Sequence, residues 1–137
     1  MLFTDAQAAF LDEVHYAVLA TLNADGSIQQ TVVWYLRAGE AIWISMGAAS
    51  IKARNLGRNA NATLTIEDGV RYLTLSGTGT LHPPDDTLRA RLATRYLGPE
   101  RATAWLGQRS DAARVLTQLT PNRIYGQGID PPQKRNA

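Results

Sequence analysis

The chain has 137 residues, of which 45% are hydrophobic and 19% charged, a composition typical of a globular protein long enough for one domain with its own core. It has no cysteine, which excludes disulfides, thiolate metal sites and a cysteine nucleophile. Its formal net charge is only +2 and its arginines are scattered, so it lacks the basic stripe that nucleic acid binding requires.

The first half of the chain predicts a helix followed by short strands. Thr4 is a candidate N-cap and Gln7 lies three residues further on, as in a capping box, so a helix is expected over residues 4–14. Apolar or alternating runs separated by turn signals such as NADG then predict strands. These strands are expected to form an antiparallel meander over residues 16–22, 28–37 and 41–46.

The second half predicts two helical regions and three more strands. In chain order we expect a short helix over 50–59, strands over 62–68 and 71–81, a helical region from 83 interrupted at 98–100 and continuing over 101–116, and a strand over 116–128. Gly77 and Gly79 predict a bulge or sharp bend in the long strand, as in a small closed or partly open barrel. Residues from about 127 to 137 are expected to form a flexible tail.

Polar residues with catalytic potential do not form a recognisable catalytic set. His15 and His82 have no partner at metal-ligand spacing, so no metal site is expected. The serines lack a nucleophile elbow. The consecutive acidic pairs lie in helix starts and turns, where capping and solubility explain them: Asp12/Glu13, Glu67/Asp68 and Asp85/Asp86. The catalytic residues are therefore unknown from sequence, and in an enzyme of this kind a bound cofactor would carry the reactive chemistry.

The segment SMGAASIKARNLGRN, residues 45–59, has the features of an anion site. Helix N-termini bind phosphate readily, and Gly47 and the two following alanines would let a ligand approach the backbone. Ser50 could cap the helix or donate to an anion. Lys52 and Arg54 fall in the first turns, where each basic residue costs about 0.3–1 kcal/mol unless an anion is present. The alternative is that these charges are merely solvated.

Aromatic residues lie close to this segment in the sequence. Trp34, Tyr35 and Trp43 belong to the two strands before the basic helix. They could offer a stacking surface for a flat ring, or they could pack in the core or at an interface. Both interpretations remain open from the sequence.

The stretch from VLATLNADGSIQQTVVWYLRAGEAIWISMGAASIKARNLGRNANATLTIED to YLTLSGTGTL resembles the flavin/deazaflavin oxidoreductase superfamily, the pyridoxamine-phosphate-oxidase-like FMN-binding split barrels. Within it, SIKARNLGRNANATL is most similar to the K-x-R-N-L-x-R-x-P segment of the branch that uses coenzyme F420. The resemblance covers residues 10–126. It implies an α+β fold, mainly β with helices, in which an antiparallel split β-barrel has short helices covering its ends.

The resemblance also implies a set of cofactor-binding positions. Lys52 matches the lysine that binds the coenzyme phosphate. The remaining positions line the ring, lead to the phosphate or belong to the phosphate and tail-binding segment: Val32, Val33, Trp34, Ser45, Met46, Gly47, Ser50, Ile51, Arg54 and Asn55. The chain departs from the pattern at Ala60 or Asn61, where proline is common, and at Ser50, where some relatives have arginine.

The implied function is that of a coenzyme F420-dependent oxidoreductase, transferring a hydride from the reduced deazaflavin to an electron-poor small molecule such as a quinone or enone. The alternatives are an FMN-binding flavoprotein of the same fold and a non-catalytic cofactor-binding protein. The family further implies a homodimer with cofactor sites between the subunits. No apolar run approaches the roughly 18 residues that span a bilayer, and the N-terminus lacks signal-peptide features, so we expect a cytoplasmic protein of one domain, residues 1–137, without a membrane partner.

Overall fold

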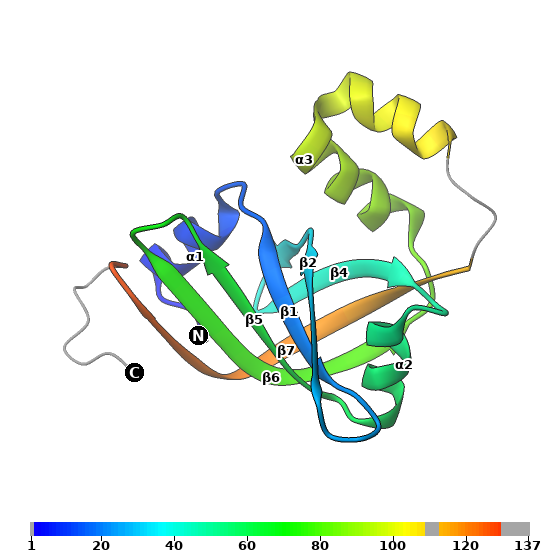
Figure 1. Cartoon of the computed structure of the whole chain (residues 1–137). Coiled ribbons are helices and arrows are strands. Elements are labelled where there is room, and N and C mark those ends of the chain that lie inside the picture. The colour runs from blue at the N-terminus through cyan, green and yellow to red at the C-terminus, as the bar shows by residue number, and fades with distance from the viewer. Residues whose placement is uncertain (1, 109–112, 130–137) are drawn as a thin grey trace.

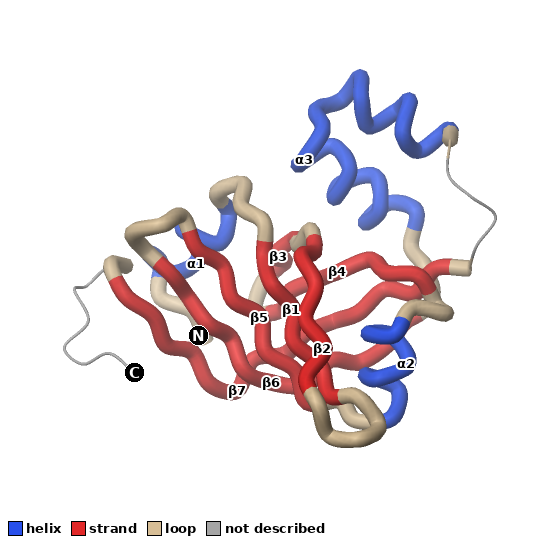
Figure 2. Tube along the Cα trace, viewed as in Figure 1, coloured by secondary structure: helices blue, strands red, loops and turns tan. Residues whose placement is uncertain are grey.

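The computed structural model describes residues 2–108 and 113–129, which form a curled antiparallel sheet and flanking helices (Figures 1 and 2). The elements are α1 (Asp5–Asp12), β1 (Ala17–Leu22), β2 (Ile28–Val33), β3 (Leu36–Ala38), β4 (Ala41–Gly47), α2 (Ile51–Arg58), β5 (Asn61–Glu67), β6 (Tyr72–His82), α3 (Asp86–Gly107) and β7 (Arg114–Gln127). The capping box predicted for the first helix is confirmed, because Gln7 N donates to Thr4 Oγ1 and Thr4 N donates to Gln7 Oε1.

The sheet is curled because its two edges are joined by a very short piece of chain. The strand order is β2-β1-β5-β6-β7-β4-β3, so β2 and β3 occupy opposite edges. Val33 ends β2 and Leu36 begins β3, which leaves two residues to connect the edges. A flat sheet of seven strands spaced about 4.8 Å apart would be far too wide for that link. The predicted α+β fold with a split barrel is therefore confirmed.

The predicted continuous strand over 28–37, and the meander built on it, are wrong. β2 pairs with β1, whereas β3 pairs with β4, and the chain leaves one edge of the sheet for the other at Trp34 and Tyr35. Tyr35 is fully buried, and its hydroxyl donates to Leu11 O at 2.7 Å. Its backbone N–H donates to the Tyr96 hydroxyl at 3.1 Å, in place of a strand partner.

The predicted helix over 101–116 is also wrong at its end. α3 ends at Gly107, and residues 114–116 begin β7, opposite residues 45–47 of β4. β4 has a strongly apolar inner face, and pairing with β7 satisfies its backbone within the sheet. Residues 109–112 and 130–137 lie outside the described residues. Order extends further than predicted at the C-terminus, since Ile129 is 4% exposed and belongs to the core.

The predicted irregularity of the long strand is confirmed. The register between β6 and β7 shifts between Ser76 and Gly77. A Cβ at Gly77 would lie 2.1 Å from Thr120 O, so only glycine fits at this crossing. The predicted interruption in the helical region is present as well, because Gly98 within α3 has a φ of 81° that breaks the helical geometry.

The core lies inside the curled sheet and is closed by α1. The predicted alternation in β4 is confirmed, because Ile42, Ile44 and Met46 are buried on one face. Leucine and isoleucine side chains from β5 and β6 pack against them: Leu64, Ile66, Leu73 and Leu75. This arrangement leaves the C-terminal end of β4, the end of β2 and the start of α2 at one side of the barrel, where α3 lies across them (Figure 1).

Candidate functional site

A cavity of about 360 Å³ opens between the barrel and α3. Its walls come from the start of β1, the end of β2, the end of β4, α2, α3 and the start of β7. The lining residues are Tyr16, Val32, Val33, Trp34, Ser45, Met46, Gly47, Lys52, Arg89, Leu92, Ala93, Trp105 and Arg114. Ligand pockets in proteins are typically of about this size or somewhat larger, about 300–1,000 Å³.

The structure brings together seven of the eleven positions predicted to bind a cofactor. They come from three separate parts of the chain, and all line this cavity: Val32, Val33, Trp34, Ser45, Met46, Gly47 and Lys52. The end of β4 and the start of α2 are neighbours in sequence, but β2 reaches the same place only because the sheet is curled. The remaining predicted positions, Ser50, Ile51, Arg54 and Asn55, lie outside the lining.

Ser50 and Asn55 have structural partners instead. Ser50 is the N-cap of α2, where its hydroxyl accepts from Ala53 N and donates to Gly47 O. Asn55 is buried, and its amide donates to the side chains of Thr21 and Asn23. The two Asn55 bonds fasten α2 to β1 and to the turn that follows it. Of the two uses that the sequence left open for Ser50, the structure shows the cap.

Ile51 and Arg54 are exposed on α2, whereas Lys52 faces the cavity. Among the described residues, none forms a hydrogen bond or an ion pair with the Lys52 side chain. Lys52 is therefore a cation in the first turn of a helix, where the helix dipole is unfavourable to it, and it has no protein counter-charge in the described part of the chain. A Cβ at nearby Gly47 would meet nothing within 4 Å, so space is open there.

A row of aromatic rings runs beside the cavity from β1 to α3. Tyr16 stacks on Tyr96 with 5.7 Å between ring centroids, and Tyr96 stacks on Trp34 at 4.9 Å. Trp105 lies tilted against Trp34 at 5.6 Å. Of the three aromatics considered as a stacking surface, Trp34 therefore faces the cavity. Tyr35 is in the core, and Trp43 packs on His82 outside the lining.

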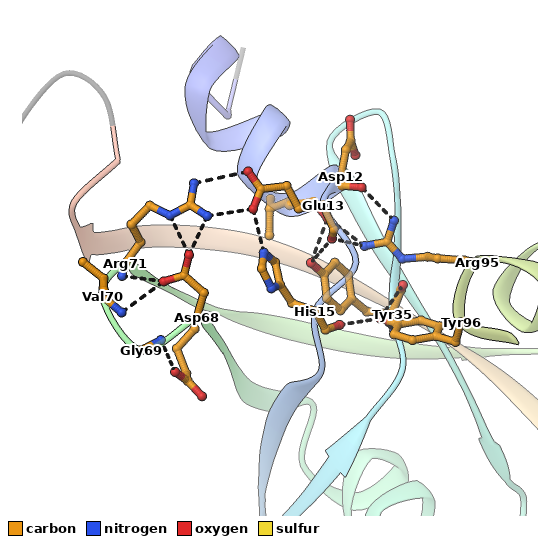
Figure 3. A network of polar contacts seen from close by, with 12 residues as sticks. Asp12, Glu13, His15, Tyr35, Asp68, Gly69, Val70, Arg71, Arg95 and Tyr96 are labelled. Atoms are coloured by element: carbon orange, nitrogen blue, oxygen red, sulfur yellow. Dashed lines mark hydrogen bonds and ion pairs between the residues drawn. The ribbon is translucent and has the colours of Figure 1, made fainter.

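The first half of α3 is fastened to the loop after α1 by a polar network (Figure 3). The guanidinium of Arg95 donates to the backbone oxygens of Leu11, Asp12 and Glu13. The Tyr96 hydroxyl donates to His15 O at 2.6 Å. The Arg95 bonds join a cation to the last carbonyls of α1, which have no partner within the helix. They hold α3 across the barrel with its apolar face over the cavity.

Two cavity arginines were missed by the sequence reasoning. Arg89 of α3 is 6% exposed, and its guanidinium lies 5.6 Å from the Trp105 ring centroid. Arg114 of β7 donates to Ser45 Oγ at 3.1 Å. Burial, and then the neighbouring Arg89 charge, lower the pKa of Arg114. One signal was visible in the sequence: Arg89 lies three and four residues before Leu92 and Ala93, on the apolar face of the helix.

The charged side chains among the described residues of the cavity lining are all positive. Its described residues include three cationic side chains, Lys52, Arg89 and Arg114, and no carboxylate. The described residues also contain no group of three His, Cys, Asp or Glu side chains able to hold a metal ion. The arrangement offers positive charge at one side and flat aromatic surface at another, so it suits an anionic molecule with a flat apolar part.

A family model described as pyridoxamine 5'-phosphate oxidase matches residues 3–128, nearly the whole chain. The chain belongs to this family. An F420H2-dependent biliverdin reductase of Mycobacterium tuberculosis is 32% identical over 129 residues, covering 90% of this chain and 87% of the relative. The family assignment agrees with the superfamily resemblance drawn from the sequence.

Solved structures of the family superpose well on this chain. A conserved hypothetical protein of Mycobacterium tuberculosis has a TM-score of 0.74 at 25% identity, covering 92% of this chain and 85% of that one. A protein described as an F420 reductase has a TM-score of 0.73 at 24% identity, covering 89% of this chain and 98% of that one, and shows the shared fold. In the described part of the chain, no helix is long and apolar enough to cross a bilayer.

Proposed function

We propose that this protein is a coenzyme F420-dependent reductase of small, electron-poor molecules. The observation that carries the proposal is the single cavity in which Lys52, Gly47 and residues 32–34 come together, although they are distant in sequence. The similarity to a reductase whose name specifies F420H2 supports the choice of cofactor. Reduced F420, when bound, would supply a hydride to an acceptor lying against its ring.

The residues of the cavity fit such a cofactor. Lys52 would hold the phosphate, since its ammonium faces the cavity without a counter-charge among the described residues. The open space at Gly47 leaves room for the chain that joins phosphate to ring. The ring would lie along Val32, Val33 and Trp34, which line the cavity beside the row of aromatic rings. Small residues and fixed donors of this kind position a ligand with little reorganisation.

The protein itself would bind and orient the cofactor and shield its ring from water. Arg95 and Tyr96 hold α3 over the cavity, so that Leu92 and Ala93 exclude water from one face of the ring. Exclusion of water protects a reactive reduced cofactor from side reactions and strengthens electrostatic contacts. The acceptor would enter at the opposite face.

Replacement of Lys52 tests the phosphate assignment. Lys52→Ala should weaken F420 binding by about 1.5–3 kcal/mol, because a charge-assisted hydrogen bond is lost. Tryptophan fluorescence would report binding, since Trp34 and Trp105 line the cavity. Arg101→Ala is the control, because Arg101 is an exposed cation outside the cavity lining. Equal affinities for the wild type and the Lys52 variant would remove Lys52 from the site.

The choice between F420 and FMN is decided by parallel titrations of the purified protein. Both cofactors carry a phosphate that Lys52 could hold, so any difference in affinity must come from contacts to the ring and the tail. We expect saturable binding of F420 at lower concentrations than FMN. The reverse order would assign the protein to the flavin branch. Binding without turnover of any acceptor would support a non-catalytic carrier.

Acceptors should be screened once the cofactor is bound. The open cavity and its aromatic wall favour flat conjugated molecules, and we expect quinones, enones or a linear tetrapyrrole such as biliverdin to oxidise the reduced cofactor. Biliverdin is included because the relative at 32% identity is named for it. Loss of F420H2 absorbance under anaerobic conditions would measure each rate.

We further propose a homodimer that completes the site. Apolar side chains are exposed on β1, on the adjacent edge strand β2 and just before β1: Tyr16 63%, Val18 37%, Ile28 66% and Val32 66%. Val18 and Val32 face each other across the two strands. Val32 and Tyr16 also line the cavity, so a second subunit covering this surface would close the cavity at that side.

A further inference from the structure

Arg89 and Arg114 hold more positive charge in the cavity than one phosphate at Lys52 requires. A guanidinium carries five N–H donors in a fixed fork that matches a carboxylate. The Nε groups of both arginines are buried and have no hydrogen-bond partner among the described residues. Arg114 donates to Ser45, but the guanidinium of Arg89 lies over the face of Trp105, and its side chain makes no hydrogen bond within the described residues.

This pair is held in place by different parts of the fold. Arg114 is fixed by the β4–β7 ladder, where it lies opposite Gly47. Arg89 is fixed by α3, which Arg95 fastens to the loop after α1. Bringing two like charges together in a buried place is unfavourable unless an anion joins them. The fold therefore maintains this costly arrangement on one wall of the cavity, beside Trp105.

We propose that Arg89 and Arg114 form a carboxylate-binding subsite for the electron acceptor, so that the acceptor is a flat conjugated acid rather than a neutral molecule. The carboxylate would bridge the two guanidinium groups while the flat part lies against Trp105 and Trp34. This inference rests on the proposed reductase function. A carboxylate could also come from the tail of the cofactor. Arg89 is only 6% exposed, which favours a group carried into the cavity over a tail that extends into solvent.

The test uses anthraquinone-2-carboxylic acid and its methyl ester, which differ in the charge that the subsite would recognise. Each is titrated calorimetrically into the F420-loaded and the cofactor-free protein. The wild type should bind the acid more tightly than the ester. Arg89→Gln and Arg114→Gln should each weaken acid binding by about tenfold to a hundredfold, the loss expected for a charge-assisted contact, and leave ester binding unchanged.

Two further variants make the result specific. Arg91→Gln removes an exposed charge from the same helix, and it should keep the wild-type preference for the acid. Arg89→Lys keeps a positive charge in place and should restore part of that preference, even if Arg89→Gln folds poorly.

The outcomes separate this inference from the reductase proposal. Equal binding of acid and ester by the wild type would overturn the subsite. A loss of F420 affinity in Arg89→Gln as large as its loss of acid affinity would also overturn it, by assigning the pair to the cofactor tail. If F420 fails to bind while the cofactor-free protein still prefers the acid through Arg89, the subsite stands and the reductase proposal fails.

Discussion

Gly47 illustrates how a single small residue can shape the candidate site. It ends β4, faces the cavity and has open space where a Cβ would point. Its neighbours are already placed by other interactions, since Ser50 donates to the Gly47 carbonyl and Ala48 N donates to Ala113 O. Packing within the described subunit therefore does not require the absence of a side chain at Gly47, which agrees with the role in cofactor binding that we propose.

The corresponding prediction concerns Gly47→Val. Because the new side chain would meet no protein atom, the free energy of unfolding should change by about 0.5 kcal/mol or less. F420 affinity should fall by about tenfold or more, since the valine occupies space in the cavity. Chemical denaturation and fluorescence titration would measure the two quantities. Ala49→Val, at an exposed position outside the lining, is the control, and an equal loss in both variants would contradict the assignment.

For individual residues, the sequence predicted those site residues whose role follows from local chemistry. It missed those that reach the cavity only through long-range tertiary contacts. Lys52 was predicted because an unfavourable charge at a helix start is visible in the sequence, and Gly47 because a residue without a side chain lets a ligand approach the backbone; the family resemblance indicates both. Arg89 and Arg114 were missed because the path of α3 over the barrel and the start of β7 beside β4 are decided by tertiary contacts. Asn55 was placed in the cofactor-binding segment by the family resemblance alone, and the structure shows its amide donating to Thr21 and Asn23.

Among the elements, β6 and β7 depend most on a glycine. At Gly77 the two strands come so close that a Cβ would lie 2.1 Å from Thr120 O and 2.8 Å from Pro121 Cα. The register shift at this point bends both strands and contributes to the curl of the barrel. The position tolerates no side chain unless the backbone moves.

Gly77→Ala should therefore destabilise the protein by about 3 kcal/mol or more, at or beyond the upper end for overpacking. Gly57→Ala is the control and should have the opposite effect on stability. Gly57 lies within α2, and a Cβ there would be 3.8 Å from Leu81 Cδ1, an ordinary contact distance. Alanine should stabilise that helix by about 0.5–1 kcal/mol. Urea denaturation would measure both, and similar midpoints for the two variants would show that the strands can separate at Gly77.

The turn between β5 and β6 carries the clearest pH dependence. The backbone N–H and the guanidinium of Arg71, with a further bond from Val70 N, lower the pKa of Asp68 from its ordinary 3.8 to about 2 (Figure 3). A carboxyl with a depressed pKa contributes stability above its unfolded pKa and loses it as the pH falls through the folded pKa. The contribution of Asp68 should therefore be complete above about pH 4 and vanish towards pH 2.

Asp68→Asn should reduce stability at neutral pH, and the difference from the wild type should shrink between about pH 4 and pH 2. Urea midpoints measured across this range would follow the difference. Glu100 is exposed on α3, so Glu100→Gln should show the same dependence of the urea midpoint on pH as the wild type. A difference that stays constant with pH would show that the carboxylate does not act through its charge.

The elements themselves were largely predictable, and the two errors have a common cause. Periodicity and turn signals predicted the strands, and the Thr4/Gln7 pair predicted the cap of α1, because these features depend on local sequence. The break at Trp34 and Tyr35 was missed because an unbroken apolar run does not indicate where a chain changes strand partners. The end of α3 was missed because helical composition continues past Gly107, whereas Leu116 is needed by the sheet.

For the whole molecule, the main prediction is that it forms a dimer through the outer faces of β1 and β2. We expect the wild type to sediment as a dimer and Val18→Glu to sediment as a monomer, because a charge would be buried without a partner at the interface. Val70→Glu is the matched control, since Val70 is 80% exposed in the turn before β6. A monomeric wild type would contradict the proposal and leave the cavity open at Val32.

The order of the strands also determines when the site can form during synthesis. β4, which carries Ser45, Met46 and Gly47, is paired along residues 42–47 with β7, the last strand among the described residues. Arg114 arrives only with that strand. Nascent domains can begin to fold while the ribosome is still adding residues, at about 5–20 per second. This cavity, however, needs residues as far apart in the sequence as Tyr16 and Arg114. We therefore expect ribosome-bound chains that stop before Arg114 to bind no cofactor, so that cofactor uptake waits until β7 has been synthesised.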